Sequence, residues 1–130
     1  GRVALGGEVR SDGGGAVAVV PRDGVRRRFH AVLEAGRLHA ELERDRFRAE
    51  RAVVVAEDLG RLTFELETDD PRAHTAPLRL EGLPAGTWEV REEGEPARRF
   101  EALEGWASTV EVAVAGSRGA GPVTVGRVGA

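Results

Sequence analysis

Short segments of alternating apolar and polar residues, separated by turns rich in glycine and proline, recur along this 130-residue chain. The clearest example is the 77–94 stretch. Leu78 and Leu80 are the apolar positions of its first arm, and Trp88 and Val90 those of its second. Between the arms, a Pro-Ala-Gly sequence combines a proline that fixes one φ angle with a glycine that is free to take a positive one. Alternation of period two with turns at this spacing predicts antiparallel β-strands.

Along the whole chain, the pattern predicts about ten short strands and no alternation of strands with helices. The fold class expected is therefore all-β, an antiparallel β-sandwich of the jelly-roll-like or immunoglobulin-like kind. A polar loop is predicted at 68–76, ended by Pro71 and Pro77, and turns are predicted at 11–15, 21–24 and 116–121. The strands are expected at 2–5 with 8–10 (one edge strand broken at two glycines), 16–20, 25–34, 38–43, 51–57, 62–67, 78–83, 87–91, 97–103, 108–114 and 122–125.

The segment 37–51 allows a second interpretation, because alanine, leucine, glutamate and arginine are good helix formers. Its clean alternation and the glycine turns around it favour a strand, and 45–50 is the part that the pattern defines least. One core is expected to collect the inward-facing side chains of the central strands. Its members are Leu62, Phe64, Leu66, Leu78, Leu80, Val90, Val110, Val112 and Val114.

Length and composition limit the possible classes of protein. A chain of this size is expected to form a single domain, residues 1–130, and the absence of an initial methionine favours a fragment of a larger chain. Cysteine is absent, which excludes disulfides and thiol chemistry. The net charge of −3, with acidic and basic residues interspersed, predicts neither a nucleic-acid partner nor an anionic membrane surface. No apolar segment approaches the length of a membrane span, and no signal peptide is recognisable.

The residue alphabet is unusual. All 19 residues counted as lysine or arginine are arginine, and Asn, Gln, Ile, Met and Tyr are missing as well. Extreme GC bias in a bacterial genome favours such a composition, and a deliberately simplified, engineered sequence is the alternative.

The hairpin at 77–94 also resembles a known kind of domain. The sequence Leu-x-Gly-Leu-Pro-Ala-Gly-Thr-Trp-x-Val, followed by an acidic glycine turn, is similar to a hairpin of accessory, C-terminal-type β-sandwich domains in bacterial secreted carbohydrate-active enzymes. The closing strands at 108–114 and 122–125 fit the same order, so the resemblance covers about residues 77–128. It implies a non-catalytic role, an extracellular or periplasmic location, and a glycoside hydrolase or polysaccharide lyase as the parent protein.

Several residues are candidates for ligand binding. Trp106 stands in a glycine-flanked loop, and loop aromatics stack on sugar rings, whereas Trp88 lies mid-strand and is expected in the core. Arg98 and Arg99 are expected near Trp106, and Arg26 and Arg28 belong with Arg22 and Arg27 to a second basic run beside His30. Guanidinium groups suit carboxylates and sulfates, so an acidic polysaccharide is one expected partner. The competing interpretation is that these arginines protect strand edges and balance nearby carboxylates.

Metal binding and catalysis have weaker support in the sequence. His39, Glu41 and Glu43 share one strand face and are candidates for a metal site, although a solvated outer face is the simpler interpretation. The acidic turns Glu57-Asp58, Asp69-Asp70 and Glu92-Glu93 lack a calcium-loop spacing. No nucleophile motif, phosphate loop or zinc pair is present, so we expect no catalytic residues and no cofactor.

These observations predict a non-catalytic accessory domain that packs against a neighbouring domain or weakly contacts glycan. A structural or assembly module, including an engineered scaffold, is the first alternative. A small enzyme with its site at the mouth of the sandwich is the second, and a buried acid–base pair in a cleft would favour it.

Overall fold

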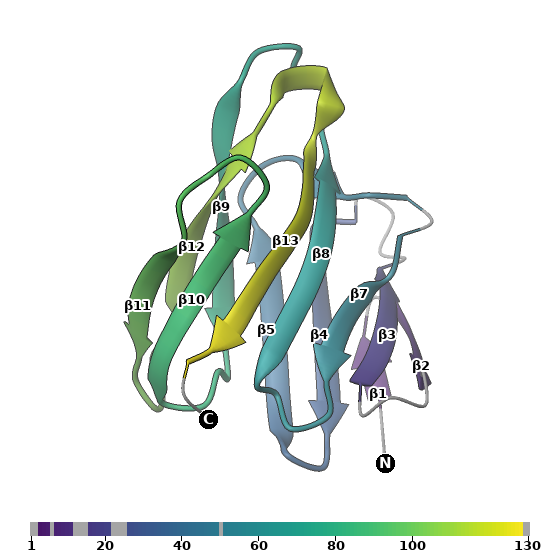
Figure 1. Cartoon of the computed structure of the whole chain (residues 1–130). Coiled ribbons are helices and arrows are strands. Elements are labelled where there is room, and N and C mark those ends of the chain that lie inside the picture. Colours follow the sequence, from purple (N-terminus) through teal and green to yellow (C-terminus); the bar gives the residue numbers. More distant parts are fainter. Residues whose placement is uncertain (1–2, 6, 12–15, 22–25, 50, 129–130) are drawn as a thin grey trace.

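The computed structural model describes residues 3–5, 7–11, 16–21, 26–49 and 51–128, and the side chains of 3–11, 20 and 21 are left out of the description. Within these residues the chain is almost entirely β-structure. Two antiparallel sheets lie face to face (Figure 1). The predicted all-β sandwich is therefore confirmed.

The five-stranded sheet has the order β1 (Val3–Leu5), β4 (Arg28–Leu33), β5 (Gly36–Leu42), β9 (His74–Glu81) and β12 (Ser108–Val114). The second sheet runs in the order β11 (Arg98–Ala102), β10 (Gly86–Glu92), β13 (Ala120–Arg127), β8 (Arg61–Glu67), β7 (Val53–Ala56), β3 (Ala16–Pro21) and β2 (Gly7–Ser11). The short β6 (Arg46–Phe47) pairs with β8 and makes this the eight-stranded sheet.

The core lies between the sheets and follows the predicted alternation. All nine predicted core residues belong to one buried cluster, and Trp88 at its end is fully buried, with its indole Nε1–H donating to the Pro84 carbonyl oxygen at 2.9 Å. Phe47 contacts both Phe29 and Phe64, at ring-centroid distances of 5.5 and 5.8 Å. Because edge-to-face aromatic contacts add to apolar burial, this line of rings ties β4, β6 and β8 into one core.

The described residues of the segment 37–51 form a strand, a turn and the short β6, and contain no helix. β5 ends at Leu42, and Asp45 takes a positive φ of 64° before β6 begins. A positive φ is uncommon for residues with a side chain, and Asp is among the types that tolerate it best. The strand predicted at 25–34 starts only at Arg28 in the described residues, and the guanidinium of Arg27, just before it, donates to the Asp45 carbonyl oxygen at 2.9 Å.

The prediction of a polar loop over 68–76 is wrong at its C-terminal end, because β9 begins at His74 and runs through Pro77. The Pro77 carbonyl oxygen accepts a bond from the Glu43 backbone N–H at 3.1 Å, just beyond the end of β5. Pro77 has no backbone N–H to donate, but it lies where the hydrogen bonds between β5 and β9 end. The sheet therefore loses little stability from this missing donor.

The chain termini differ from the prediction in two places. The expected single broken edge strand at the N-terminus is two strands in different sheets, with β1 beside β4 and β2 beside β3. The loose turn at 116–121 is a short 3-10 helix, η1 (Gly116–Arg118), after which β13 begins at Ala120. Pro122 then sits where the register with β8 shifts, a position that suits proline. The turns predicted at 12–15 and 22–24, with Arg22, lie outside the described residues.

In the described ranges, no helix is long and apolar enough to cross a membrane.

Candidate functional site

A cleft opens at one end of the sandwich, between β9 and β12 of one sheet and β10 and β13 of the other. Its volume is about 760 Å³, within the range of small-molecule pockets. Small residues and backbone form most of its walls, and His74, Glu93, Glu95 and Arg118 contribute polar groups. The place matches the sandwich-mouth site of the enzyme alternative, so the chemistry of His74 decides what this cleft can do.

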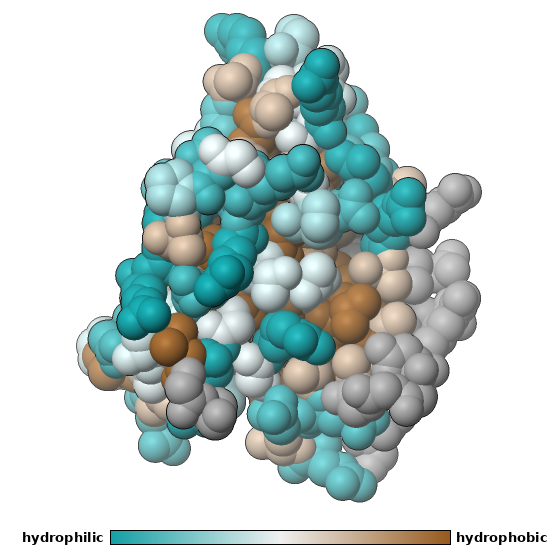
Figure 2. Space-filling model, viewed as in Figure 1, coloured by the Kyte–Doolittle hydropathy of each residue, from teal (hydrophilic) through white to brown (hydrophobic). Residues whose placement is uncertain are grey.

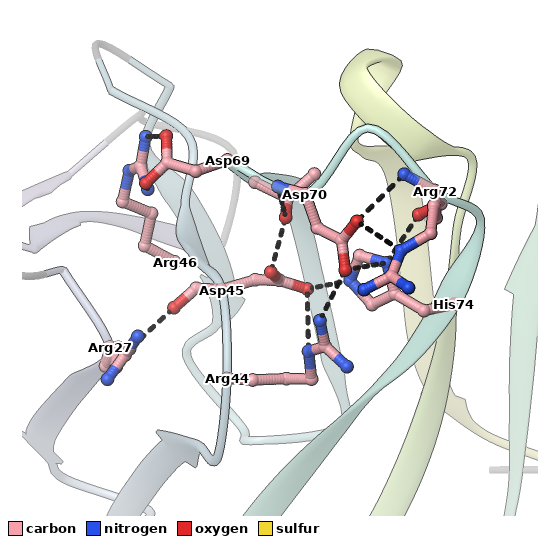
Figure 3. Close-up of polar contacts among 9 residues, drawn as sticks. Arg27, Arg44, Asp45, Arg46, Asp69, Asp70, Arg72 and His74 are labelled. Carbon is pink, nitrogen blue, oxygen red and sulfur yellow. Dashed lines mark hydrogen bonds and ion pairs between the residues drawn. The ribbon is translucent and has the colours of Figure 1, made fainter.

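His74 forms a buried acid–base pair with Asp45 (Figure 3). The His74 Nε2 and Asp45 Oδ2 atoms are 2.6 Å apart, and the side chains are only 10% and 6% exposed. The other carboxylate oxygen, Oδ1, accepts a hydrogen bond from the Thr68 hydroxyl at 2.6 Å. Arg44 lies near the pair, with its Nε 3.9 Å from Asp45 Oδ2.

Both ring nitrogens of His74 have acceptors as partners. Nδ1 lies 2.8 Å from the Arg72 carbonyl oxygen, and Nε2 faces the Asp45 carboxylate. The pKa of His74 is raised above its usual value, most by the hydrogen bond to the Arg72 carbonyl and next by the hydrogen bond to the Asp45 carboxylate. Burial lowers this pKa by a smaller amount. The imidazolium form thus satisfies both partners and leaves no nitrogen lone pair to accept a proton from a substrate.

Further ion pairs fix the loop that carries these groups. Asp70 accepts from the Arg72 backbone N–H at 2.9 Å and from Arg44 Nη2 at 3.1 Å. The backbone and guanidinium of Arg72 lower the pKa of Asp70 to about 2. Asp69 receives two bonds from Arg46, at 2.9 and 3.0 Å, and this pairing lowers the Asp69 pKa. We name Arg44, Asp45, Thr68, Asp70, Arg72 and His74 the Asp45–His74 cluster. Its hydrogen bonds and ion pairs join the residues that follow β5 to the loop before β9 and to the first residue of β9.

Trp106 lies where the sequence placed it, in the loop between β11 and β12. Its side chain is 72% exposed and that of Leu103 is 59% exposed, and these are the exposed large hydrophobic residues of the described chain. The Trp106 backbone N–H donates to the Leu103 carbonyl oxygen at 3.1 Å, and Gly105 between them takes a φ of 79°. A single tight turn therefore presents both side chains to solvent.

Arg98 and Arg99 do not act together. Arg98 Nη2 donates to the Glu111 carbonyl oxygen of β12, in the other sheet, at 2.6 Å. It also pairs with Glu92 Oε2 of β10, in its own sheet, at 3.1 Å. Glu92 in turn accepts from the Ala113 backbone N–H at 2.7 Å. The two side chains cover the open edge of β12, as expected of edge protection. Arg99, the next residue of β11, points to the opposite side of its sheet.

The second predicted group, Arg26, Arg28 and His30, is also divided. Arg26 precedes β4 with a φ of 52°, donates to the Phe47 carbonyl oxygen at 3.1 Å and pairs with Glu67 at 3.0 Å. Arg28 and His30 project from the outer face of β4, opposite Glu41 and His39 of β5. Only the latter two residues of the predicted group share a surface.

The metal candidates share a face only in part. His39 and Glu41 lie on the outer face of β5, with His39 Nε2 4.0 Å from Glu41 Oε2, whereas Glu43 follows the end of the strand. Among the residues described, no three histidine, aspartate or glutamate side chains are placed to hold a metal ion.

Comparison with known proteins gives no relatives: no family model matches the chain, and no curated protein or solved structure is significantly similar to it. The resemblance of residues 77–128 to accessory domains of carbohydrate-active enzymes therefore stays a prediction.

Proposed function

We propose that this chain is a non-catalytic β-sandwich module that packs against a neighbouring domain of its parent protein through Leu103 and Trp106. The observation that carries the proposal is the exposure of these two large apolar side chains on one turn. Burying a tryptophan and a leucine removes apolar surface from water, which is the main favourable term in association.

The rest of the described surface supports a small contact of this kind. Figure 2 shows that hydrophilic and neutral residues cover most of the coloured part of the face formed by β10, β13 and β8, and that hydrophobic residues gather mainly near β7. A partner that covered this whole face would meet mainly polar groups, whereas one that meets the Leu103–Trp106 turn finds apolar surface.

The position of the turn also fits a partner in the same chain. Gly86 of β10 pairs with Ala102 on one side, and the Val128 backbone N–H donates to the neighbouring Thr87 carbonyl oxygen at 2.8 Å. The end of β13 and the start of the 103–107 loop thus flank the same end of β10 (Figure 1). A polypeptide continuing beyond β13 would leave the sandwich close to Leu103 and Trp106.

The Asp45–His74 cluster supports a non-catalytic role rather than the enzyme alternative. A general base needs a lone pair within reach of the substrate proton, and both His74 nitrogens and both Asp45 oxygens already have partners. A weak glycan contact through Trp106 is the second candidate. It is favoured by the flat exposed indole, and it is disfavoured by the aliphatic Leu103 beside it and by the commitment of Arg98 to Glu92 and β12.

Acrylamide quenching of tryptophan fluorescence tests the proposal. Trp88 is fully buried, so the difference between the wild-type chain and Trp106→Ala reports on Trp106. We expect Trp106 to be quenched in the 130-residue chain and protected in a longer parent chain that contains the next domain. Equal quenching in both would refute docking. A change of Trp106 emission with neutral or acidic polysaccharides, absent in Trp106→Ala, would assign the turn to glycan binding instead.

A further inference from the structure

Two histidines face each other on the outer side of the five-stranded sheet. His30 of β4 and His39 of β5 are direct partners in the antiparallel register. Their ring centroids lie 5.7 Å apart, with the ring planes at 88°. Both residues are half-buried, so the rings are held by their neighbours and still reached by solvent.

The hydrogen-bond pattern explains why the rings are close. The Leu42 backbone N–H donates to the Arg27 carbonyl oxygen at 2.7 Å, which marks these two residues as a hydrogen-bonded pair. Hydrogen-bonded and non-hydrogen-bonded pairs alternate along an antiparallel ladder, so His30 and His39, three pairs further along, are a non-hydrogen-bonded pair. Side chains approach each other most closely at such pairs.

The two rings border a shallow hollow. Its volume is about 420 Å³, and its lining consists of His30, Arg37, His39, Glu81 and Gly82. Glu81 of β9 is the register partner of His39 on the other side of β5. The hollow therefore joins two imidazoles from adjacent strands with one carboxylate from a third.

We propose that His30 and His39 together bind a divalent first-row transition-metal ion, such as Zn²⁺, Ni²⁺ or Cu²⁺, for which imidazole is a preferred ligand. Metal–nitrogen bonds are about 2.0–2.1 Å long, so two imidazoles on one ion place their ring centroids roughly 5–6 Å apart. The observed 5.7 Å fits this separation without movement of the strands. Since no third protein ligand is in place among the described residues, water completes the coordination. Two carboxylates lie near the imidazoles: Glu41, whose Oε2 is 4.0 Å from His39 Nε2, and Glu81, which lines the hollow.

The charges around the hollow limit the strength of the site. Arg37 lines the same hollow and repels a cation, and Glu81 is paired with Arg79 at 3.0 Å. A two-imidazole site with a neighbouring guanidinium is expected to bind and release its ion readily. The same reasoning gives an independent test, because Arg37→Ala removes the repulsion and is expected to tighten binding.

His74 provides an internal control. Both of its ring nitrogens are already bonded, to the Arg72 carbonyl and to Asp45, so it is not available as a ligand in the folded chain. The sequence contains three histidines, and the proposal therefore names the two that respond to metal and the one that does not.

The experiment is a titration of the 130-residue chain with Zn²⁺ in a non-chelating buffer, followed by isothermal calorimetry and by NMR of the imidazole nitrogens. We expect one ion per chain, with the His30 and His39 signals shifting together while those of His74 stay in place. His30→Ala and His39→Ala are each expected to weaken binding by at least about tenfold, because a single imidazole cannot chelate. Glu81→Gln reports whether the carboxylate contributes.

Two results would overturn the proposal: the absence of Zn²⁺ binding to the wild-type chain, or binding of equal strength in the His30→Ala/His39→Ala variant. Circular dichroism checks that each variant keeps its sheet signal. Where an alanine variant loses it, His30→Gln or His39→Gln takes its place, since glutamine preserves a polar side chain and removes the imidazole.

Discussion

The stability of the fold should fall as the pH rises above neutrality, through His74. Its pKa is raised in the folded chain by the Arg72 carbonyl and the Asp45 carboxylate, whereas the ordinary value is 6.5. Below that value both states hold the proton and the stabilisation is complete. Above it the unfolded chain releases the proton while the folded chain retains it. Stability therefore decreases by at most about 1.4 kcal/mol per pH unit until the folded pKa is passed.

The substitutions that isolate this effect follow from the contacts. His74→Gln should abolish the decrease. Asp45→Asn should reduce it without abolishing it, because the Arg72 carbonyl still favours the imidazolium. Asp45→Ala removes the carboxylate that accepts from His74 Nε2 and from the Thr68 hydroxyl, and the loss of stability at about pH 6 should be roughly 3–5 kcal/mol.

Urea denaturation measured by the fluorescence of the buried Trp88 is the suitable assay, since guanidinium salts would screen the charges under test. The matched control is the His30→Gln/His39→Gln variant, which leaves the Asp45–His74 cluster intact and should keep the wild-type dependence on pH. The reasoning is refuted if His74→Gln and the wild-type chain lose stability in parallel between about pH 6.5 and 9.

Three further predictions concern single positions. Phe64→Ala should destabilise the chain by about 3–5 kcal/mol in urea denaturation, and a loss below about 1 kcal/mol would contradict its central place in the core. Gly82→Ala should lower the melting temperature far more than Gly94→Ala. Both glycines have positive φ. A Cβ at Gly82 would lie 1.8 Å from the Arg37 carbonyl oxygen, whereas a Cβ at Gly94 would meet nothing within 4 Å. Equal effects of the two substitutions would argue against the close contact at Gly82. The difference in stability between the wild-type chain and Asp70→Asn should be constant above pH 3.8, the ordinary pKa of an aspartate, and should vanish as the pH falls through about 2. Acid titration of the folded signal measures this difference. A difference that persists at the acid end would contradict the pairing of Asp70.

The sandwich and its core could be predicted because both depend on local signals. Alternation of period two along 62–67 and 108–114 determines which side chains point inward, and the glycine and proline turns determine where the chain reverses. Burial of Phe64 and Val112 follows directly from these patterns. Which sheet a strand joins is not a local property, and for this reason β1 and β2 were expected together and lie in different sheets.

The Asp45–His74 cluster could not be found in the same way. Its two central residues are 29 positions apart, and they meet only because β9 begins at His74 and lies beside β5. The prediction started this strand only after Pro77, which placed His74 in a loop, and it left 45–50 undefined. The sequence nevertheless contained a signal for the turn, because Asp45 follows a predicted strand and aspartate is a frequent turn residue. A carboxylate that is buried at such a turn needs a cationic or hydrogen-bonding partner.

The arginines of this chain show why its basic runs are poor guides to a ligand. Lysine is absent, and the rigid, five-donor guanidinium is suited to reach carbonyl oxygens that strand ends and edges leave without partners. Backbone oxygens at such places accept bonds from Arg26, Arg27, Arg48, Arg98 and Arg127.

Donors used in this way are not available for a sugar carboxylate, and carboxylates such as Glu67, Asp69 and Asp70 occupy further guanidinium groups. These arginines and carboxylates thus join strands and loops of the described chain to one another. The exposed large apolar side chains of the described residues, Leu103 and Trp106, lie at the end of the sandwich where β13 also ends. For this reason a docking partner, rather than an acidic ligand, best explains the exposed tryptophan.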